Sequence, residues 1–153
     1  MKPHLETTAR LSLAIWVGGG AFLATVAAPA AFSAAGSPGE AARVVGEMLF
    51  RWHWISTLAP LLVLLSPRFR QRLPLVLIIV AIVLANSQWM VDNRIQQIRA
   101  SVEGSVSDLD QNDPVRRRFG ALHGASMTLL LGQLLCGAGV IGTDRSTRGG
   151  DTR

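Results

Sequence analysis

The stretch LPLVLIIVAIVLA, residues 73–85, decides the fold class of this chain. It forms the centre of an apolar segment over residues 73–91 that contains no charged side chain. Because an α-helix rises about 1.5 Å per residue, a segment of this length crosses the hydrocarbon core of a bilayer, which is about 30 Å thick. The segment therefore predicts a membrane-spanning helix.

Further apolar segments lie on both sides of it, at about residues 11–35, 50–66 and 119–141. Only 16% of the 153 residues are charged, against about 25% in soluble domains, and the charges cluster between the apolar segments. The pattern predicts an all-α, integral membrane four-helix bundle. We expect one transmembrane domain over residues 1–142 and a disordered tail over residues 143–153, which is polar and rich in glycine.

Two of these helices are expected to extend outside the bilayer. Ser37, Pro38 and Glu40 have the spacing of an N-cap, a first helical residue and a capping box. The second helix should therefore begin in water near Pro38 and enter the membrane near Phe50. The third helix keeps apolar residues at helical spacing beyond Val91, which predicts an amphipathic extension. For the fourth helix, Asp113 and Pro114 mark an upstream start.

The distribution of basic residues indicates the orientation. The short basic turn SPRFRQR, residues 66–72, favours the cytoplasmic side, and both termini lie on that side if there are four spans. Arginine outnumbers lysine 14 to 1 in a chain rich in Ala and Gly, which we interpret as the coding bias of a bacterium. We expect a multi-pass protein of the bacterial inner membrane. Residues 1–30 also resemble a cleavable signal peptide, but the apolar run is longer than usual.

The helix directions place several polar residues at one depth, near the extracytoplasmic face. The polar layer predicted in this way consists of His53, Asn86, Gln88, His123 and Ser126. Trp52, Trp54 and Trp89 lie at the same level and are expected to form an aromatic rim. Such a layer serves either as hydrogen-bonding contacts between helices or as the wall of a small-ligand site.

Three functional interpretations follow from this layer. The first is a non-enzymatic membrane protein that acts through helix packing or small-ligand binding, with no cofactor expected. The second is a haem- or copper-binding protein that uses His53 and His123, with methionine thioethers as further copper ligands. The third is an oligomeric small-molecule transporter, although the predicted spans contain no Asp, Glu, Lys or Arg.

The positions of the charged residues also indicate which binding partners to expect. The arginines lie at the ends of apolar segments, where they meet lipid headgroups, so we expect the bilayer and no nucleic acid. A second copy of the chain or another membrane protein remains a candidate partner. Small residues at four-residue spacing predict close helix contacts: Gly18, Gly20, Ala24 and Ala28 on the first helix, and Gly120 and Gly124 on the fourth.

The segment LSLAIWVGGGAFLATVAAPAAF resembles the first helix of the transmembrane-protein-205-like family, known in bacteria as domain of unknown function 4149. The shared pattern comprises Trp16, Gly18, Phe22, Ala28, Pro29 and Phe32. A second pattern, in RRRFGALHGASM, comprises Phe119, Leu122, His123 and Ser126. The resemblance covers most of residues 11–133 and implies a small membrane protein of about four helices, with no established activity.

Overall fold

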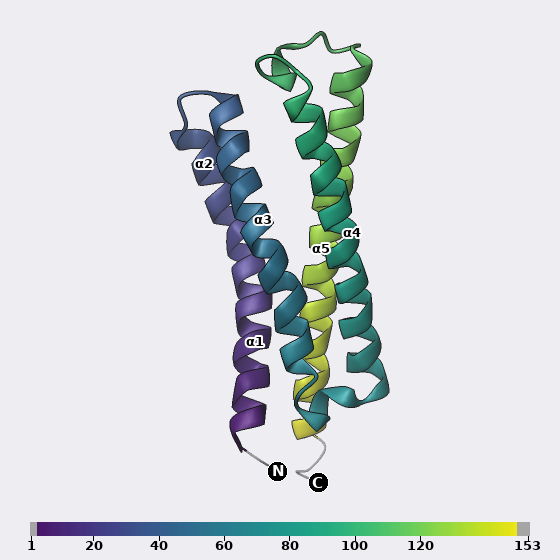
Figure 1. Cartoon of the computed structure of the whole chain (residues 1–153). Coiled ribbons are helices and arrows are strands. Elements are labelled where there is room, and N and C mark those ends of the chain that lie inside the picture. Colours follow the sequence, from purple (N-terminus) through teal and green to yellow (C-terminus); the bar gives the residue numbers. More distant parts are fainter. Residues whose placement is uncertain (1–2, 150–153) are drawn as a thin grey trace.

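The computed structural model describes residues 3–149, and within them every regular element is helical. The long helices are α1 (Pro3–Phe22), α3 (Pro38–Val63), α4 (Arg72–Ala100) and α5 (Pro114–Gly149). Shorter elements join them: η1 (Leu23–Ala27), α2 (Ala28–Ala34), η2 (Pro67–Arg70) and η3 (Val106–Asp108). The long helices lie side by side, and α1 and α5 bring both ends of the chain to the same end of the bundle (Figure 1). The predicted four-helix, all-α fold is confirmed.

Among the described residues, three segments are long and apolar enough to cross a membrane: His4–Ala34, Arg72–Ala100 and Pro114–Thr143. The helix α3 is not among them, because its first half carries alternating charges from Glu40 to Arg51. Its second half nevertheless exposes large apolar side chains, namely Trp54, Ile55, Leu58, Leu61 and Leu62. The fourth span, at residues 50–66, therefore stays a prediction.

The caps that start α3 and α5 are confirmed. The Ser37 hydroxyl accepts a hydrogen bond from the Glu40 amide at 3.2 Å. The Glu40 carboxylate accepts from the Gly36 amide at 3.2 Å, one residue before the position of a standard capping box. At the start of α5, the Asp113 carboxylate accepts from the Val115 amide at 2.7 Å. These bonds satisfy amide groups that have no partner inside the helix.

Both helix extensions predicted beyond the apolar segments, those of the second and third helices, are present. The helix α3 begins at Pro38, well before the apolar segment at residues 50–66. The helix α4 continues past residue 91 to Ala100, and Ile95 of this extension is buried. The helix α5 continues beyond residue 141 to Gly149, into the segment that we predicted to be disordered. The last part of that segment, residues 150–153, lies outside the described residues.

The first apolar segment contains a wide turn that the sequence did not predict. The Ala28 amide donates to the Leu23 carbonyl, five residues earlier, which defines the π-helix η1. The next residue, Pro29, has no amide hydrogen and its ring would clash with a carbonyl in regular helical register. The wide turn immediately precedes the proline, and α2 continues the same helical arm to Ala34.

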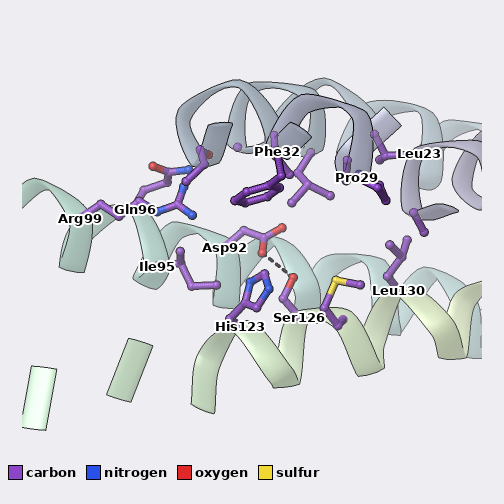
Figure 2. A pocket seen from close by; sticks show the side chains of 17 residues that line it. Leu23, Pro29, Phe32, Asp92, Ile95, Gln96, Arg99, His123, Ser126 and Leu130 are labelled. Atoms are coloured by element: carbon purple, nitrogen blue, oxygen red, sulfur yellow. Dashed lines mark hydrogen bonds between the residues drawn. The ribbon is translucent and has the colours of Figure 1, made fainter. Parts of the chain in front are cut away.

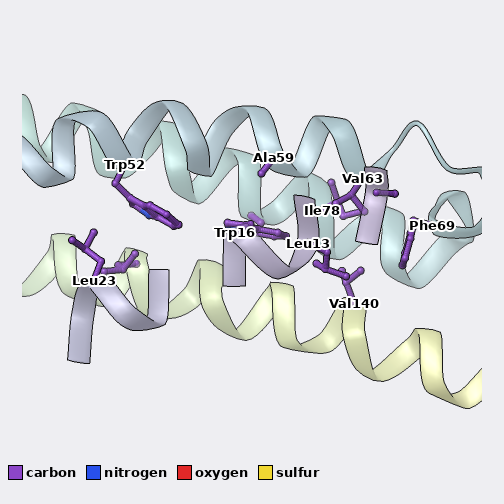
Figure 3. Close-up of a cluster of buried hydrophobic side chains, with 12 residues drawn as sticks. Leu13, Trp16, Leu23, Trp52, Ala59, Val63, Phe69, Ile78 and Val140 are labelled. Carbon is purple, nitrogen blue, oxygen red and sulfur yellow. The ribbon is translucent and has the colours of Figure 1, made fainter. Parts of the chain in front are cut away.

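The core lies between α1, α3, α4 and α5, and Phe69 of η2 also belongs to it (Figure 3). Trp16 and Trp52 are its largest side chains, and they are 1% and 8% exposed. The prediction that Trp52 forms part of an aromatic rim is therefore wrong, whereas Trp54 is exposed as expected. Successive helical residues are about 100° apart, so two positions two residues apart face nearly opposite sides.

The glycines predicted to pack between helices behave differently from one another. A Cβ atom at Gly20 would lie 2.7 Å from Leu134 and 3.0 Å from Trp52, so Gly20 does allow a close approach. At Gly18, Gly120 and Gly124 a Cβ atom would meet nothing within 4 Å, so the prediction of helix contacts there is wrong within the described chain. Among the described glycines of α5, Gly137 has the tightest contact, because a methyl group there would overlap Val17. Gly139 is also closely approached, with Leu77 2.9 Å from the position of an added Cβ atom.

Candidate functional site

A row of polar side chains crosses the interface between α4 and α5. The Gln133 amide donates to the Gln88 side-chain oxygen at 2.6 Å, and the Gln88 amide donates to the Ser126 hydroxyl at 3.4 Å. The Ser126 hydroxyl in turn donates to the Asp92 carboxylate at 2.7 Å. Gln88, Ser126 and Gln133 are buried, being 5%, 3% and 1% exposed. We call these four residues the polar ladder.

The polar ladder includes only part of the polar layer predicted from the sequence. Gln88 and Ser126 belong to it, as expected. Asn86 does not, because it is exposed and its amide donates back to the Ile82 carbonyl of its own helix at 2.8 Å. Asn86 and Gln88 are two positions apart on α4, so one faces away from α5 when the other faces it.

Gln133 and Asp92 were missed by reasoning from the sequence alone. The signal for Gln133 is its position seven residues after Ser126, which places both on one helix face. The signal for Asp92 is its position four residues after Gln88, immediately beyond the predicted end of the third span at residue 91. Helical periodicity therefore could have found both residues.

The two histidines lie in different surroundings. His53 on α3 stacks on Trp89 of α4, with ring centroids 5.3 Å apart and an angle of 16° between the rings. His123 stacks on Phe119 of its own helix, with centroids 6.3 Å apart. Within the described residues, no group of three or more His, Cys, Asp or Glu side chains is arranged to hold a metal ion. Each imidazole therefore packs against an aromatic ring.

A cavity of about 260 Å³ opens beside the polar ladder, between α2–α3 and α4–α5. Most of its walls are apolar, and they include Leu23, Phe32, Leu49, Ile95, Met127 and Leu130. One side is polar, with Asp92 and Ser126 next to His123, and with Gln96 and Arg99 further along α4 (Figure 2). The cavity thus combines an apolar body with a cluster of polar groups, which is typical of small-molecule sites.

A second cavity, of about 440 Å³, continues from the first toward the loop between α4 and α5. Phe32, Gln96, Arg99 and His123 line both cavities. The outer cavity is more polar, with Arg43, Ser105 and Ser107 among its lining residues. We call the two cavities together the crevice.

Arg99 stands where the two cavities meet, and its guanidinium already has partners. It donates to the Ala42 carbonyl of α3 at 2.8 Å. It also lies over the Phe119 ring, 5.3 Å from the centroid, in a cation–π contact. These contacts connect α3, α4 and α5 at the outer end of the crevice.

The two sequence patterns that suggested a family resemblance converge on the inner cavity. Ala28, Pro29 and Phe32 come from the first pattern, and His123 and Ser126 come from the second. The wide turn η1 and Pro29 lie in the same wall, and π-turns inside helices occur frequently at functional sites.

A family model described as a domain of unknown function, DUF4149, matches residues 11–101. The match extends from α1 through the end of α4 and includes Asp92 and Arg99, whereas α5 with His123 and Ser126 lies outside it. No match was found among curated proteins or among solved structures.

Proposed function

We propose that this chain, which belongs to the DUF4149 family, is a non-enzymatic membrane protein that binds a small amphipathic molecule in the crevice. The apolar part of the molecule would lie among Leu23, Phe32, Leu49 and Leu130, and its polar end would meet Asp92, Ser126 and His123. The single observation that carries the proposal is the cavity of about 260 Å³ whose mostly apolar walls end at a half-buried carboxylate.

The walls of the crevice support binding rather than simple helix packing. Tightly packed helix interfaces leave few voids larger than a water molecule. Here a cavity separates α2 and α3 from α4 and α5, and residues of α2, α3, α4 and α5 line it. An apolar void facing lipid would be filled by an acyl chain or a similar molecule, because an empty cavity loses the dispersion contacts of its lining.

The location of the crevice points to a ligand taken from the membrane. We propose four spans, with α3 as the fourth, in the bacterial inner membrane and with both termini in the cytoplasm. The crevice then opens near the extracytoplasmic surface, because it lies at the end of the bundle opposite the termini. An amphipathic molecule in the outer leaflet would have its polar group at this depth.

The alternatives receive less support. A haem or copper site would need His53 and His123 to point at a common ligand, and each imidazole instead stacks on an aromatic ring. Transport by an oligomer would need a continuous polar path. Asp92 does bring a carboxylate next to the predicted third span, but the polar ladder ends at Gln133, which is buried, and does not continue as a lined channel.

The test compares two substitutions on the same helix. Ala28 lines the inner cavity, whereas Ala30 is exposed and does not line it. The protein would be placed in phosphatidylcholine nanodiscs, and binding of radiolabelled dodecanol would be measured after subtraction of empty nanodiscs. We expect saturable binding by the wild type and by Ala30→Phe, and at least a tenfold weaker binding by Ala28→Phe, because its ring occupies the cavity (roughly one and a half kcal/mol).

The proposal fails if the wild type shows no saturable binding, or if Ala28→Phe and Ala30→Phe bind dodecanol equally. Both variants are to be compared for helix content by circular dichroism and for monodispersity. A loss of binding then reports on the cavity rather than on misfolding.

A further inference from the structure

Asp92 faces the crevice without forming an ion pair. Its carboxylate accepts one hydrogen bond, from Ser126 at 2.7 Å, and its side chain is half-buried. The ion pairs in the described part of the chain join Arg10 and Arg68 to Glu6, and Arg51 to Glu47, and none of them involves Asp92. Burying a charge without a counter-ion is costly, so a cation bound beside this carboxylate would offset the cost of its burial.

The polar ladder is directed toward this carboxylate. Gln133 donates to Gln88, Gln88 donates to Ser126 and Ser126 donates to Asp92. Each donor therefore orients its positive end toward Asp92, and hydrogen bonds in a chain reinforce one another. A ladder with this direction ends with a hydroxyl donor on the Asp92 carboxylate, so the polar contacts between α4 and α5 fix the position of this carboxylate at the cavity wall.

The cationic groups nearby are engaged elsewhere. The Arg99 guanidinium binds the Ala42 carbonyl and lies over Phe119. No hydrogen bond or ion pair within the described residues joins Asp92 to His53, His123 or Arg99. The direction in which the carboxylate remains accessible is the apolar cavity, and the Phe32 ring on α2 faces it from the opposite wall (Figure 2).

We propose that Asp92 recognises a positively charged ammonium group on the amphipathic molecule that occupies the crevice. This inference rests on the proposed function and adds the chemical class of the ligand, a cationic amphiphile. The carboxylate supplies the counter-charge, the Phe32 ring presents a face on which a cation is attracted, and the apolar walls receive the alkyl chain. A lipid with an anionic head group alone would place like charges together at Asp92.

The test uses three amphiphiles with the same twelve-carbon chain and different head groups: dodecyltrimethylammonium, dodecanol and dodecanoate. Their binding is measured in phosphatidylcholine nanodiscs at one ionic strength, with empty nanodiscs subtracted. We expect the wild type to bind dodecyltrimethylammonium about tenfold or more tightly than dodecanol, because a contact between opposite charges replaces the contact of a neutral hydroxyl group with Asp92. Dodecanoate should bind most weakly, because its charge has the same sign as that of Asp92.

Substitutions at Asp92 assign this preference to the carboxylate. In Asp92→Asn the ratio of the affinity for dodecyltrimethylammonium to the affinity for dodecanol should fall to about twofold or less. Asp92→Glu should keep the preference for dodecyltrimethylammonium, which would show that a negative charge at this position is sufficient for the preference. Glu103→Gln is the matched control, because it removes one charge from an exposed position at the same end of the bundle and should leave all three affinities unchanged.

The outcomes separate the two proposals. If dodecanol itself fails to bind, the crevice is not a ligand site and the proposed function fails. If dodecanol binds but the wild type shows no preference for the cation, the inference about Asp92 is overturned. If the wild type prefers dodecanoate, the inference is also overturned, and the Arg99 guanidinium at the junction of the two cavities would explain the preference. If Asp92→Asn and Asp92→Glu lose dodecanol binding as well, Asp92 has a structural role only, and the inference is equally overturned.

Discussion

Ser126 on α5 donates a hydrogen bond to Asp92 on α4, with 2.7 Å between the hydroxyl and carboxylate oxygens. The bond joins two residues that lie 34 positions apart in the chain. It is the last step of a row that starts at Gln133 in the apolar middle of α5. The interface between α4 and α5 is therefore held by specific polar contacts in addition to apolar packing.

The contributions of Gln88 and Gln133 to the free energy of unfolding should be coupled, because their side-chain amides bond to each other. Replacing Gln133 by Leu removes the donor to Gln88 at 2.6 Å and leaves the buried Gln88 oxygen without a partner. We expect a loss of about 1–2 kcal/mol in the free energy of unfolding. The double variant Gln88→Leu/Gln133→Leu should lose less than the sum of the two single losses, because it buries no unpaired polar group.

Unfolding in mixed detergent micelles, followed by circular dichroism, measures these losses. Thr128→Val is the control, since Thr128 is exposed and bonds only to the Gly124 carbonyl of its own helix. Strictly additive losses in the double variant would contradict the predicted coupling between the two amides.

A single added methyl group on α5 should distinguish a packing glycine from an exposed one. At Gly137 the methyl group would overlap Val17, whose branched side chain has little freedom to move. Gly137→Ala is expected to lower the free energy of unfolding by about 1–3 kcal/mol. Gly120→Ala meets nothing within 4 Å and should be neutral or slightly stabilising. Equal thermal stability of the two variants would show that α1 and α5 do not pack as described.

His53 is expected to contribute to stability and not to ligand binding. Its ring stacks on Trp89 at 5.3 Å, and His53 does not line the inner or the outer cavity. His53→Ala should lower the free energy of unfolding by about 1 kcal/mol, and His53→Phe should restore most of that loss because it keeps a stacked ring. Dodecanol binding should be the same in both variants. A selective loss of binding in His53→Ala would instead place this residue in the site.

Labelling of introduced cysteines tests whether α3 crosses the membrane. The sole native cysteine is first replaced in Cys136→Ala. Ala34→Cys lies before α3 and Gln71→Cys lies after it, and both positions are exposed. With four spans, a membrane-impermeant maleimide should label Ala34→Cys in intact cells and Gln71→Cys only after permeabilisation. Labelling of both from the same side would mean that α3 lies along the membrane surface.

Much of the fold was predictable because its determinants are local. The length of the apolar stretch at residues 73–85 requires a helix in lipid, and the cap chemistry of Ser37 and Asp113 marks where helices begin. The wide turn before Pro29 was not predicted, although the proline signals some irregularity. A proline excludes one hydrogen bond of the regular helix, but it does not determine whether the helix kinks, ends or widens.

Helical periodicity and hydropathy are enough to show that the chain is helical, which segments are apolar enough for a membrane, and how far along each helix the polar residues lie. Which of these residues meet depends on the packing of the helices. Asn86 and Gln88 have nearly the same depth and similar chemistry, yet Asn86 is exposed and Gln88 is buried against α5. Depth follows from counting residues along one helix, whereas a contact depends on how far each helix is rotated about its axis, and that rotation is set by packing against the neighbouring helices.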